Sequence, residues 1–232
     1  MSTIILGIET SSDACSVAIY TSEKIFGSYV VQPQAHSKLL LAMVEDVVAQ
    51  AEITLADVVA FAFGRGPGSF TGVRIAASVI QGLAFGSGKP VIAISSLQAL
   101  AQQAFNKYTN NNILVLVDAK MKEIYCGHYR ANSQGIVEPI VEDSLLKPAE
   151  LVVDVTMQYL AVGSGVKTYG EVIASNNPQL NMNDSIEHPR AHEVVQLAAV
   201  QFALGNLLPA STAVPTYLRN DVAKKKDKKN PD

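Results

Sequence analysis

The chain has 232 residues, of which 48% are hydrophobic and 17% charged, so it has enough apolar material for one large domain or two smaller lobes. Its net charge is −3, but residues 224–232 carry five lysines and two aspartates, so the rest of the chain is acidic and is not a general nucleic-acid surface. Aromatic residues are sparse and tryptophan is absent, which argues against sites built on stacked bases or sugars.

The first half of the chain predicts three strands followed by alternating helices and strands. We expect strands at 3–8, 15–20, 24–31, 58–63 and 91–94, and helices at 36–51, 71–85 and from 95 or 96 through 105. Thr54 and Asp57 have the spacing of a capping box, and Ser69 or Thr71 can cap the helix at 71–85. Gln98 is placed to reach back to Ser95 at the start of the next helix.

The second half predicts the same order of elements. We expect strands at 113–117, 124–129, 135–141 and 159–162, a short helix at 148–153, helices near 166–174 and 191–207, and an irregular excursion at 175–190. The shared order predicts an α/β protein made of duplicated βββαβα lobes with a cleft between them. The expected domains are an N-terminal lobe at 1–105, a C-terminal lobe at 106–220 whose last helix can pack back on the first, and a disordered lysine-rich tail at 221–232.

A glycine-rich segment at 64–74, GRGPGSFTGVR, is the most informative stretch of the chain. It lies between a predicted strand and a predicted helix, an order that commonly forms an anion cradle because free N–H groups converge at a helix N-terminus. The segment does not match GxxxxGK[ST], so a Walker-type NTPase is not supported. The segment could bind a phosphate, shape a protein interface or turn the chain, and the apolar helix behind it favours the interface.

Two predicted helices are more apolar than packing on one sheet requires. In 36–51 the apolar stripe is widened by Leu39 and Leu41, and in 71–85 the polar residues Arg74, Ser78 and Gln81 form one narrow line. Either both helices lie centrally in the lobe, or they present an apolar patch to another subunit, and the two readings are compatible. The candidate partner contacts are His36, Leu40, Met43, Val44, Val47, Thr71, Arg74 and Ser78.

Evidence for chemistry is thin. A nucleotide or phosphate could meet the turn residues Thr10 and Ser11, the matching turn residue Asp118, and a GxG pair, Gly163 and Gly165. Turns of this kind are also ordinary hairpin chemistry, and a lone GxG is a weak signal. His36 is expected to be a helix cap or an interface hydrogen bonder, and no catalytic set with serine or cysteine can be assembled.

The histidines and cysteines do not indicate a metal site. His188 and His192 have a metal-compatible spacing, but Pro189 places the first at a helix cap and no carboxylate motif accompanies them, so we expect neither metal nor cofactor. Cys15 and Cys126 lie in separate strand-like runs, which is typical of free thiols in a reducing compartment. No run is long enough for a membrane span and a signal peptide is not evident, so we expect a cytoplasmic protein without membrane contact.

Four motifs together resemble the bacterial TsaB (YeaZ) family: IETS at 8–11, HS at 36–37, the glycine-rich segment at 64–74 and PxYLR at 215–219. The resemblance is specific over 1–105 and looser over 113–170. It implies an actin/Hsp70/sugar-kinase-like fold and a role in making N6-threonylcarbamoyladenosine at position 37 of tRNAs that read ANN codons. It also implies a TsaD-like catalytic subunit whose metal site lies on an HxxxH helix, a TsaE-like ATPase, and a TsaC-type enzyme that supplies threonylcarbamoyl-AMP.

The resemblance further implies a non-catalytic scaffold subunit that pairs through its N-lobe helices, with TsaD as a heterodimer or with itself when isolated. The His188 and His192 pair lies near the C-terminus rather than in the helix where TsaD carries its ligands, which agrees with a non-catalytic role. The alternative function is an ATP-dependent phosphotransferase or ATPase that uses the interlobe cleft. A third reading is weak tRNA binding through the lysine-rich tail.

Overall fold

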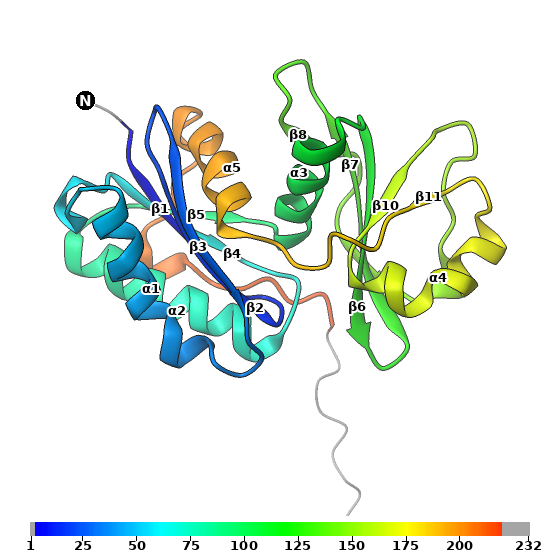
Figure 1. Ribbon diagram of the computed structural model, residues 1–232, viewed down its shortest axis with the longest axis horizontal. Coiled ribbons are helices and arrows are strands. Elements are labelled where there is room, and N and C mark those ends of the chain that lie inside the picture. The colour runs from blue at the N-terminus through cyan, green and yellow to red at the C-terminus, as the bar shows by residue number, and fades with distance from the viewer. Residues whose placement is uncertain (1–2, 220–232) are drawn as a thin grey trace, which may run out of the picture.

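Two sheets organise the chain, one in each lobe (Figure 1). The computed structural model describes residues 3–219. The first sheet has the strand order β3-β2-β1-β4-β5, with β1 at Ile5–Glu9, β2 at Ala14–Tyr20, β3 at Ile25–Val31, β4 at Ala60–Gly64 and β5 at Val91–Ile94. The second has the order β11-β10-β6-β7-β8, with β6 at Asn112–Lys120, β7 at Glu123–Ala131, β8 at Val137–Pro139, β9 (paired with β7) at Ser144–Leu146, β10 at Leu160–Val162 and β11 at Asn181–Met182.

The second sheet repeats the topology of the first. β1 pairs antiparallel with β2 and parallel with β4, and β6 likewise pairs antiparallel with β7 and parallel with β10. Reading β6, β7, β8, β10 and β11 in place of β1 to β5 gives the same strand order, which confirms an α/β fold of two duplicated lobes. The copies differ between their third and fourth strands, where the first lobe has a 15-residue helix and the second has β9 and the one-turn helix Pro148–Glu150.

Helices cover both faces of each sheet (Figure 1). On the first sheet, α1 (His36–Gln50) and α2 (Phe70–Ser87) pack on one face and α5 (Ala191–Ala203) on the other. On the second sheet, α3 (Ser96–Tyr108) and α4 (Ser164–Asn176) pack on opposite faces. The expected boundary at residue 105 therefore differs from the packing, because the apolar face of α3 joins the core of the second sheet.

Apolar spacing explains how α1 sits on the first sheet. Leu40, Met43, Val44 and Val47 recur every three or four residues and are all buried in one cluster with β1, β2 and β4. Full burial of such side chains stabilises the fold by about 1.5–3 kcal/mol each. The apolar stripe predicted for this helix is thus used mainly for the lobe's own core.

The local signals give mixed outcomes. The capping box is confirmed, because Asp57 Oδ2 accepts hydrogen bonds from Thr54 N at 2.8 Å and Thr54 Oγ1 at 2.7 Å. Ser69 rather than Thr71 caps α2, and its Oγ accepts from Gly72 N. The expectation for Gln98 is wrong: its side-chain amide donates to Val137 O at 2.9 Å, because α3 packs against the second sheet.

The cysteines, the length of the helices and the lysine-rich tail bear on the remaining expectations from the sequence. Cys15 and Cys126 are both free and buried, and they lie in different sheets. None of the helices within residues 3–219 combines the length and apolar character needed to cross a membrane. The lysine-rich tail expected at 221–232 lies outside the described residues.

Candidate functional site

The glycine-rich segment uses its backbone amides within the protein. Arg65 N donates to Ile94 O at 2.8 Å, Gly66 N donates to Ser96 Oγ at 3.1 Å, and Ser69 N donates to Ser11 O at 2.7 Å. A phosphate cradle needs such N–H groups free and converging on the ligand. The segment between β4 and α2 is therefore fastened to β5, to the start of α3 and to the first hairpin turn.

Close backbone approach explains the glycines of this segment. A Cβ on Gly68 would collide with the carbonyl group of Ser11, and one on Gly72 would collide with the carbonyl oxygen of Thr10. Thr10 Oγ1 in turn donates to Gly72 O at 2.8 Å. Thr10, predicted as a nucleotide contact, is fully buried and holds α2 against the turn that follows β1.

Glu9, the acid of the IETS motif, is buried, and the sequence did not predict a role for it. Its carboxylate accepts hydrogen bonds from Ser11 N at 2.6 Å and from Ser96 Oγ at 2.7 Å, and Gly64 leaves the space it occupies. Burial raises the pKa of Glu9 above its usual value, and the hydrogen bonds from Ser11 and Ser96 only partly offset this. The side chain ties the end of β1 to the start of α3. The sequence signal that could have indicated this role is the carboxylate at the end of the apolar strand ILGIE.

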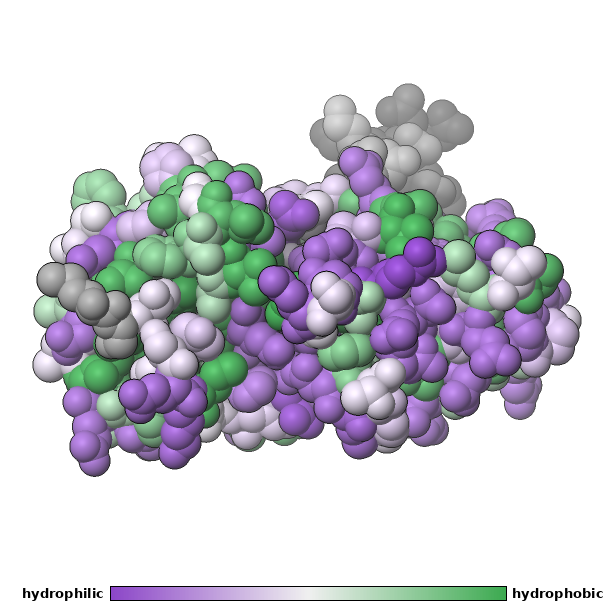
Figure 2. Space-filling model, turned by 90° about the horizontal axis from the view of Figure 1, so that it is seen from above, coloured by the Kyte–Doolittle hydropathy of each residue, from purple (hydrophilic) through white to green (hydrophobic). Residues whose placement is uncertain are grey.

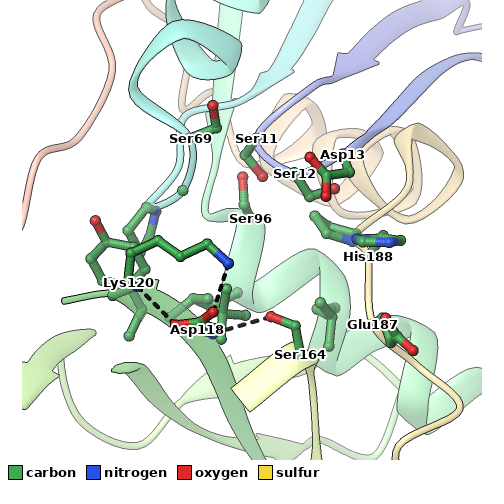
Figure 3. Close-up of a pocket in the computed structure, with 18 of the residues that line it drawn as sticks. Ser11, Ser12, Asp13, Ser69, Ser96, Asp118, Lys120, Ser164, Glu187 and His188 are labelled. Carbon is green, nitrogen blue, oxygen red and sulfur yellow. Dashed lines mark hydrogen bonds and ion pairs between the residues drawn. The ribbon is translucent and has the colours of Figure 1, made fainter. Parts of the chain in front are cut away.

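A cleft of about 440 Å³ lies between the lobes (Figure 3). The first lobe contributes mainly hydroxyls and the second mainly charged groups. The polar residues that line it are Ser11, Ser12, Asp13, Ser69, Ser96, Asp118, Lys120, Tyr125, Ser164, Lys167, Thr168, Glu187 and His188. The cleft thus brings together Ser11 and Asp118, two of the five predicted nucleotide contacts.

The cleft lysines are paired with carboxylates of the same lobe. Lys120 Nζ lies 2.7 Å from Asp118 Oδ2, and Lys167 Nζ lies 2.8 Å from Glu187 Oε1. Burial alone would raise the pKa of Asp118, but the hydrogen bonds and charge of Lys120 outweigh it and lower that pKa. A polyphosphate would have to replace both carboxylates as the partner of these ammonium groups, so the cleft is weakly prepared for one.

The GxG pair does not line the cleft. A Cβ on Gly163 would collide with the carbonyl oxygen of Leu116, and one on Gly165 would lie 2.8 Å from the same atom. Gly163 also has a φ of 110°, which a residue with a side chain rarely adopts. These glycines let α4 start close against β6, so close packing accounts for both.

The two histidines with metal-compatible spacing are not on one helix face. His188 precedes α5 and lines the cleft, where burial lowers its pKa and favours the neutral imidazole. His192 lies in the first turn of α5, and its Nδ1 is 3.1 Å from Glu193 Oε1. Among residues 3–219 no group of three or more His, Cys, Asp or Glu side chains has the arrangement of a metal site.

Five of the eight candidate partner contacts are buried within the chain itself. They are His36, Leu40, Met43, Val44 and Val47. The Nε2 atom of His36 lies 2.9 Å from Ser12 O and 3.2 Å from Ala14 O, so the ring braces the first hairpin turn. Thr71, Arg74 and Ser78 are exposed. Of the predicted contacts only those on α2 are therefore exposed, whereas on α1 a neighbouring leucine, Leu41, is exposed in their place.

The outer side of α1 and α2 forms an apolar groove of about 440 Å³, which we call the docking face. Leu41 and Phe70, which the sequence reasoning did not select as contacts, are 57% and 45% exposed there. The lining residues are Ser37, Leu40, Leu41, Phe70, Thr71, Arg74, Ile75, Ser78 and Val79. On another face of the molecule, seen in Figure 2, apolar side chains also gather over the N-terminal lobe while the C-terminal lobe is more hydrophilic.

Arg74 is the charged centre of the docking face. Its guanidinium lies 3.6 Å from the centroid of the Phe70 ring, and its Nε donates to Tyr217 Oη at 2.8 Å. The rings of Phe70 and Tyr217 are 5.6 Å apart. At exposed sites a cation–π pair is worth about 0.5–1 kcal/mol, so the three side chains favour this stacked arrangement.

Comparison with known proteins gives consistent matches over nearly the whole chain. The model of the family described as "TsaD: tRNA N6-adenosine threonylcarbamoyltransferase" matches residues 30–226. The "tRNA threonylcarbamoyladenosine biosynthesis protein TsaB" of Escherichia coli K12 is 34% identical over 96% of this chain and 97% of its own. The Haemophilus influenzae protein of the same name is 36% identical over 96% of each chain. The solved structure of YeaZ from Pseudomonas aeruginosa is 37% identical, has a TM-score of 0.86 and is matched over 93% of this chain and all of its own.

Proposed function

The chain belongs to the TsaB (YeaZ) family, and from this premise we propose that it is a non-catalytic partner subunit in the biosynthesis of tRNA threonylcarbamoyladenosine. The proposed complex transfers a threonylcarbamoyl group to N6 of adenosine 37 in tRNAs that read ANN codons. In this proposal a TsaD-like subunit carries the catalytic site and a TsaE-like ATPase joins the assembly. The isolated chain pairs with itself through the same docking face, and its compartment is the cytoplasm.

The docking face is the observation that carries this proposal. It is a groove whose exposed walls include Leu41 and Phe70, with Ile75 and Val79 half-buried along its floor. An apolar groove flanked by polar residues is the usual form of a surface that a protein partner covers. Arg74 at its centre, stacked and hydrogen-bonded, is the kind of anchor that contributes most to binding.

The alternative, an ATP-dependent phosphotransferase or ATPase, has weaker support. Three backbone amides of the glycine-rich segment donate hydrogen bonds within the protein, and both cleft lysines already have carboxylate partners. Calorimetry with Mg-ATP on the isolated chain separates the two functions. Tight binding with turnover that is lost in Asp118→Ala would favour the alternative.

The docking face is tested by placing charges on its exposed side chains. Leu41→Glu combined with Ser78→Glu changes two exposed groove residues and leaves the buried stripe of α1 intact. We expect circular dichroism to be unchanged and the affinity for the TsaD homologue of the same organism to fall at least 100-fold by calorimetry. Leu41→Glu would bury a charge without a partner, and Ser78→Glu, one helical turn from Arg74, would add a carboxylate that competes for its guanidinium.

A matched control places the same two charges elsewhere. Leu204 is 66% exposed just after α5, and Ser175 is exposed on α4. Leu204→Glu combined with Ser175→Glu should therefore retain wild-type affinity. Equal loss in both double variants, or full binding by the docking-face variant, would contradict the assignment of the interface.

A further inference from the structure

The last described segment of the chain, Ala213–Arg219, runs across the first lobe and ends against the second (Figure 1); we call it the C-terminal strap. Its first part is held by the first lobe. Gln81 Nε2 of α2 donates to Ala213 O at 3.0 Å, and Thr216 N donates to Arg65 O at 2.8 Å in the glycine-rich segment. Two hydrogen bonds to backbone atoms of the strap therefore hold it along α2, from Gln81 to the glycine-rich segment that precedes the helix.

The strap then places a side chain against two residues of the docking face. Tyr217 Oη accepts the hydrogen bond from Arg74, and its ring packs near Phe70. Tyr217 is 43% exposed and Phe70 is 45% exposed, so both remain accessible. A protein that packs on Phe70 and Arg74 must also determine where Tyr217 sits.

Two residues after Tyr217, Arg219 of the strap contacts the second lobe. The guanidinium of Arg219 forms an ion pair with Glu123 and donates to Lys120 O at 3.3 Å. Arg219 is 18% exposed and Glu123 32% exposed, so this pair is largely shielded from solvent. The pair lies at the turn between β6 and β7, where Lys120, Met121 and Lys122 all have positive φ.

The same turn reaches into the cleft. Lys120 supplies the carbonyl held by Arg219, and its ammonium pairs with Asp118 on the cleft wall (Figure 3). Tyr217, which contacts the docking face, is thus separated by a single residue from Arg219, which contacts the turn that lines the cleft. The lobes are also joined by the chain itself at 94–96 and 187–191, by the Glu9–Ser96 hydrogen bond, and by the packing of α3 on α5, where Asn106 Nδ2 donates to Gln196 Oε1 at 2.8 Å.

We propose that the C-terminal strap couples the docking face to the width of the interlobe cleft. A partner bound to Phe70 and Arg74 holds Tyr217 in place, and Arg219 then holds the β6–β7 turn against the first lobe. Without a partner the strap can loosen and the lobes can move apart about the chain crossings and the contact between α3 and α5. The identity of the partner rests on the proposed function, whereas the strap contacts do not.

Interlobe distance in the isolated chain tests the strap directly. Spin labels at Gln50→Cys on α1 and Glu171→Cys on α4 report on the two lobes, while Cys15 and Cys126 are buried and stay unlabelled. We expect Arg219→Ala to raise the population of widened conformers on the order of fivefold, the effect of losing one shielded ion pair. The conservative Arg219→Lys, which keeps a cation beside Glu123 and a donor for Lys120 O, should raise it less than Arg219→Ala, and Lys122→Ala, at an exposed residue of the same turn, should leave the wild-type distribution unchanged.

Addition of the TsaD homologue tests the coupling. In the wild-type chain binding should narrow the distance distribution, and in Arg219→Ala it should bind within about twofold of wild-type affinity without narrowing it. An isolated Arg219→Ala variant with the wild-type distribution would overturn the strap, and an unaltered response to the partner would overturn the coupling. Failure of the wild-type chain to bind the homologue would instead overturn the proposed function, and the isolated-chain measurement would still decide the strap.

Discussion

Two adjacent leucines on α1 allow the contributions of a core residue and of an exposed docking-face residue to stability and binding to be compared. Leu40 is 1% exposed and packs with the first sheet, whereas Leu41 is 57% exposed on the docking face. Both are leucines in the same helix, so Leu40→Ala and Leu41→Ala remove the same atoms and make nearly the same change in helix propensity. Any difference between the variants therefore reports the environment of the side chain.

The expected free-energy losses differ several-fold. Truncating a fully buried leucine leaves a cavity, and we expect Leu40→Ala to lower the free energy of unfolding by about 3 kcal/mol. Leu41 has little more than two fifths of its surface covered, so Leu41→Ala should cost about 0.5–1 kcal/mol. With a urea m-value of about 3 kcal/mol per molar, the midpoints should fall by about 1 M and by about 0.3 M or less.

Binding should show the opposite order. Leu41→Ala should weaken binding of the TsaD homologue by about tenfold, because an exposed interface leucine loses its contacts with the partner. Leu40 also lines the docking face but is only 1% exposed, so Leu40→Ala should weaken binding much less than Leu41→Ala at temperatures where it is folded. The reasoning is refuted if both variants lose equal stability, or if Leu40→Ala is stable and binds weakly, which would return the contacts to the stripe predicted from sequence.

Three other features give sharp predictions. Burial raises the pKa of Glu9, so the folded state holds a proton that the unfolded state releases above pH 4.5. The free energy of unfolding of the wild type, relative to that of Glu9→Gln, should therefore decline as the pH rises from 4.5. A difference between the two proteins that does not change with pH in urea titrations would contradict this. In Gly72→Ala the new methyl group meets a backbone carbonyl, so the melting temperature should fall. Gly82→Ala lies in open space on the same helix and should raise the melting temperature, because replacing a helical glycine by alanine stabilises the helix by about 0.5–1 kcal/mol. Shifts of the same sign in the two variants would refute the packing argument. Burial raises the thiol pKa to about 11 for Cys15 and about 12 for Cys126, so neither should react with a thiol reagent at pH 8 until the chain is unfolded in urea, and rapid native-state labelling would show that one is accessible.

The fold was predictable from the sequence because its signals are local. Hydrophobic periodicity and the turn residues predicted most elements, including β5 at Val91–Ile94 and the start of α1 at His36. Two short strands, β9 and β11, were missed because pairs and triplets of residues carry too little periodicity to register. α5 was predicted to end at 207 but ends at Ala203, where Gly205 with a φ of 77° turns the chain.

The site was less predictable because facing and long-range pairing are tertiary properties. An over-wide apolar stripe on α1 correctly indicated that the helix has apolar residues on more than one side, but it could not say which leucine faces the sheet. Tyr217 and Arg74 are 143 positions apart, and no spacing rule brings them together. Gly163 and Gly165 were read as ligand-contacting because close approach to a ligand and to Leu116 both favour glycine.

The glycine-rich segment and the IETS turn are best understood as one structural unit. Ser11 accepts a hydrogen bond from Ser69 and packs on Gly68, while Thr10 packs on and donates to Gly72. A side chain at either glycine would therefore push the IETS turn away from α2. This mutual fit gives a physical reason why the two motifs occur together, and it needs no phosphate. The unit fixes the start of α2, and with it the positions of Phe70 and Arg74 on which the proposed docking depends.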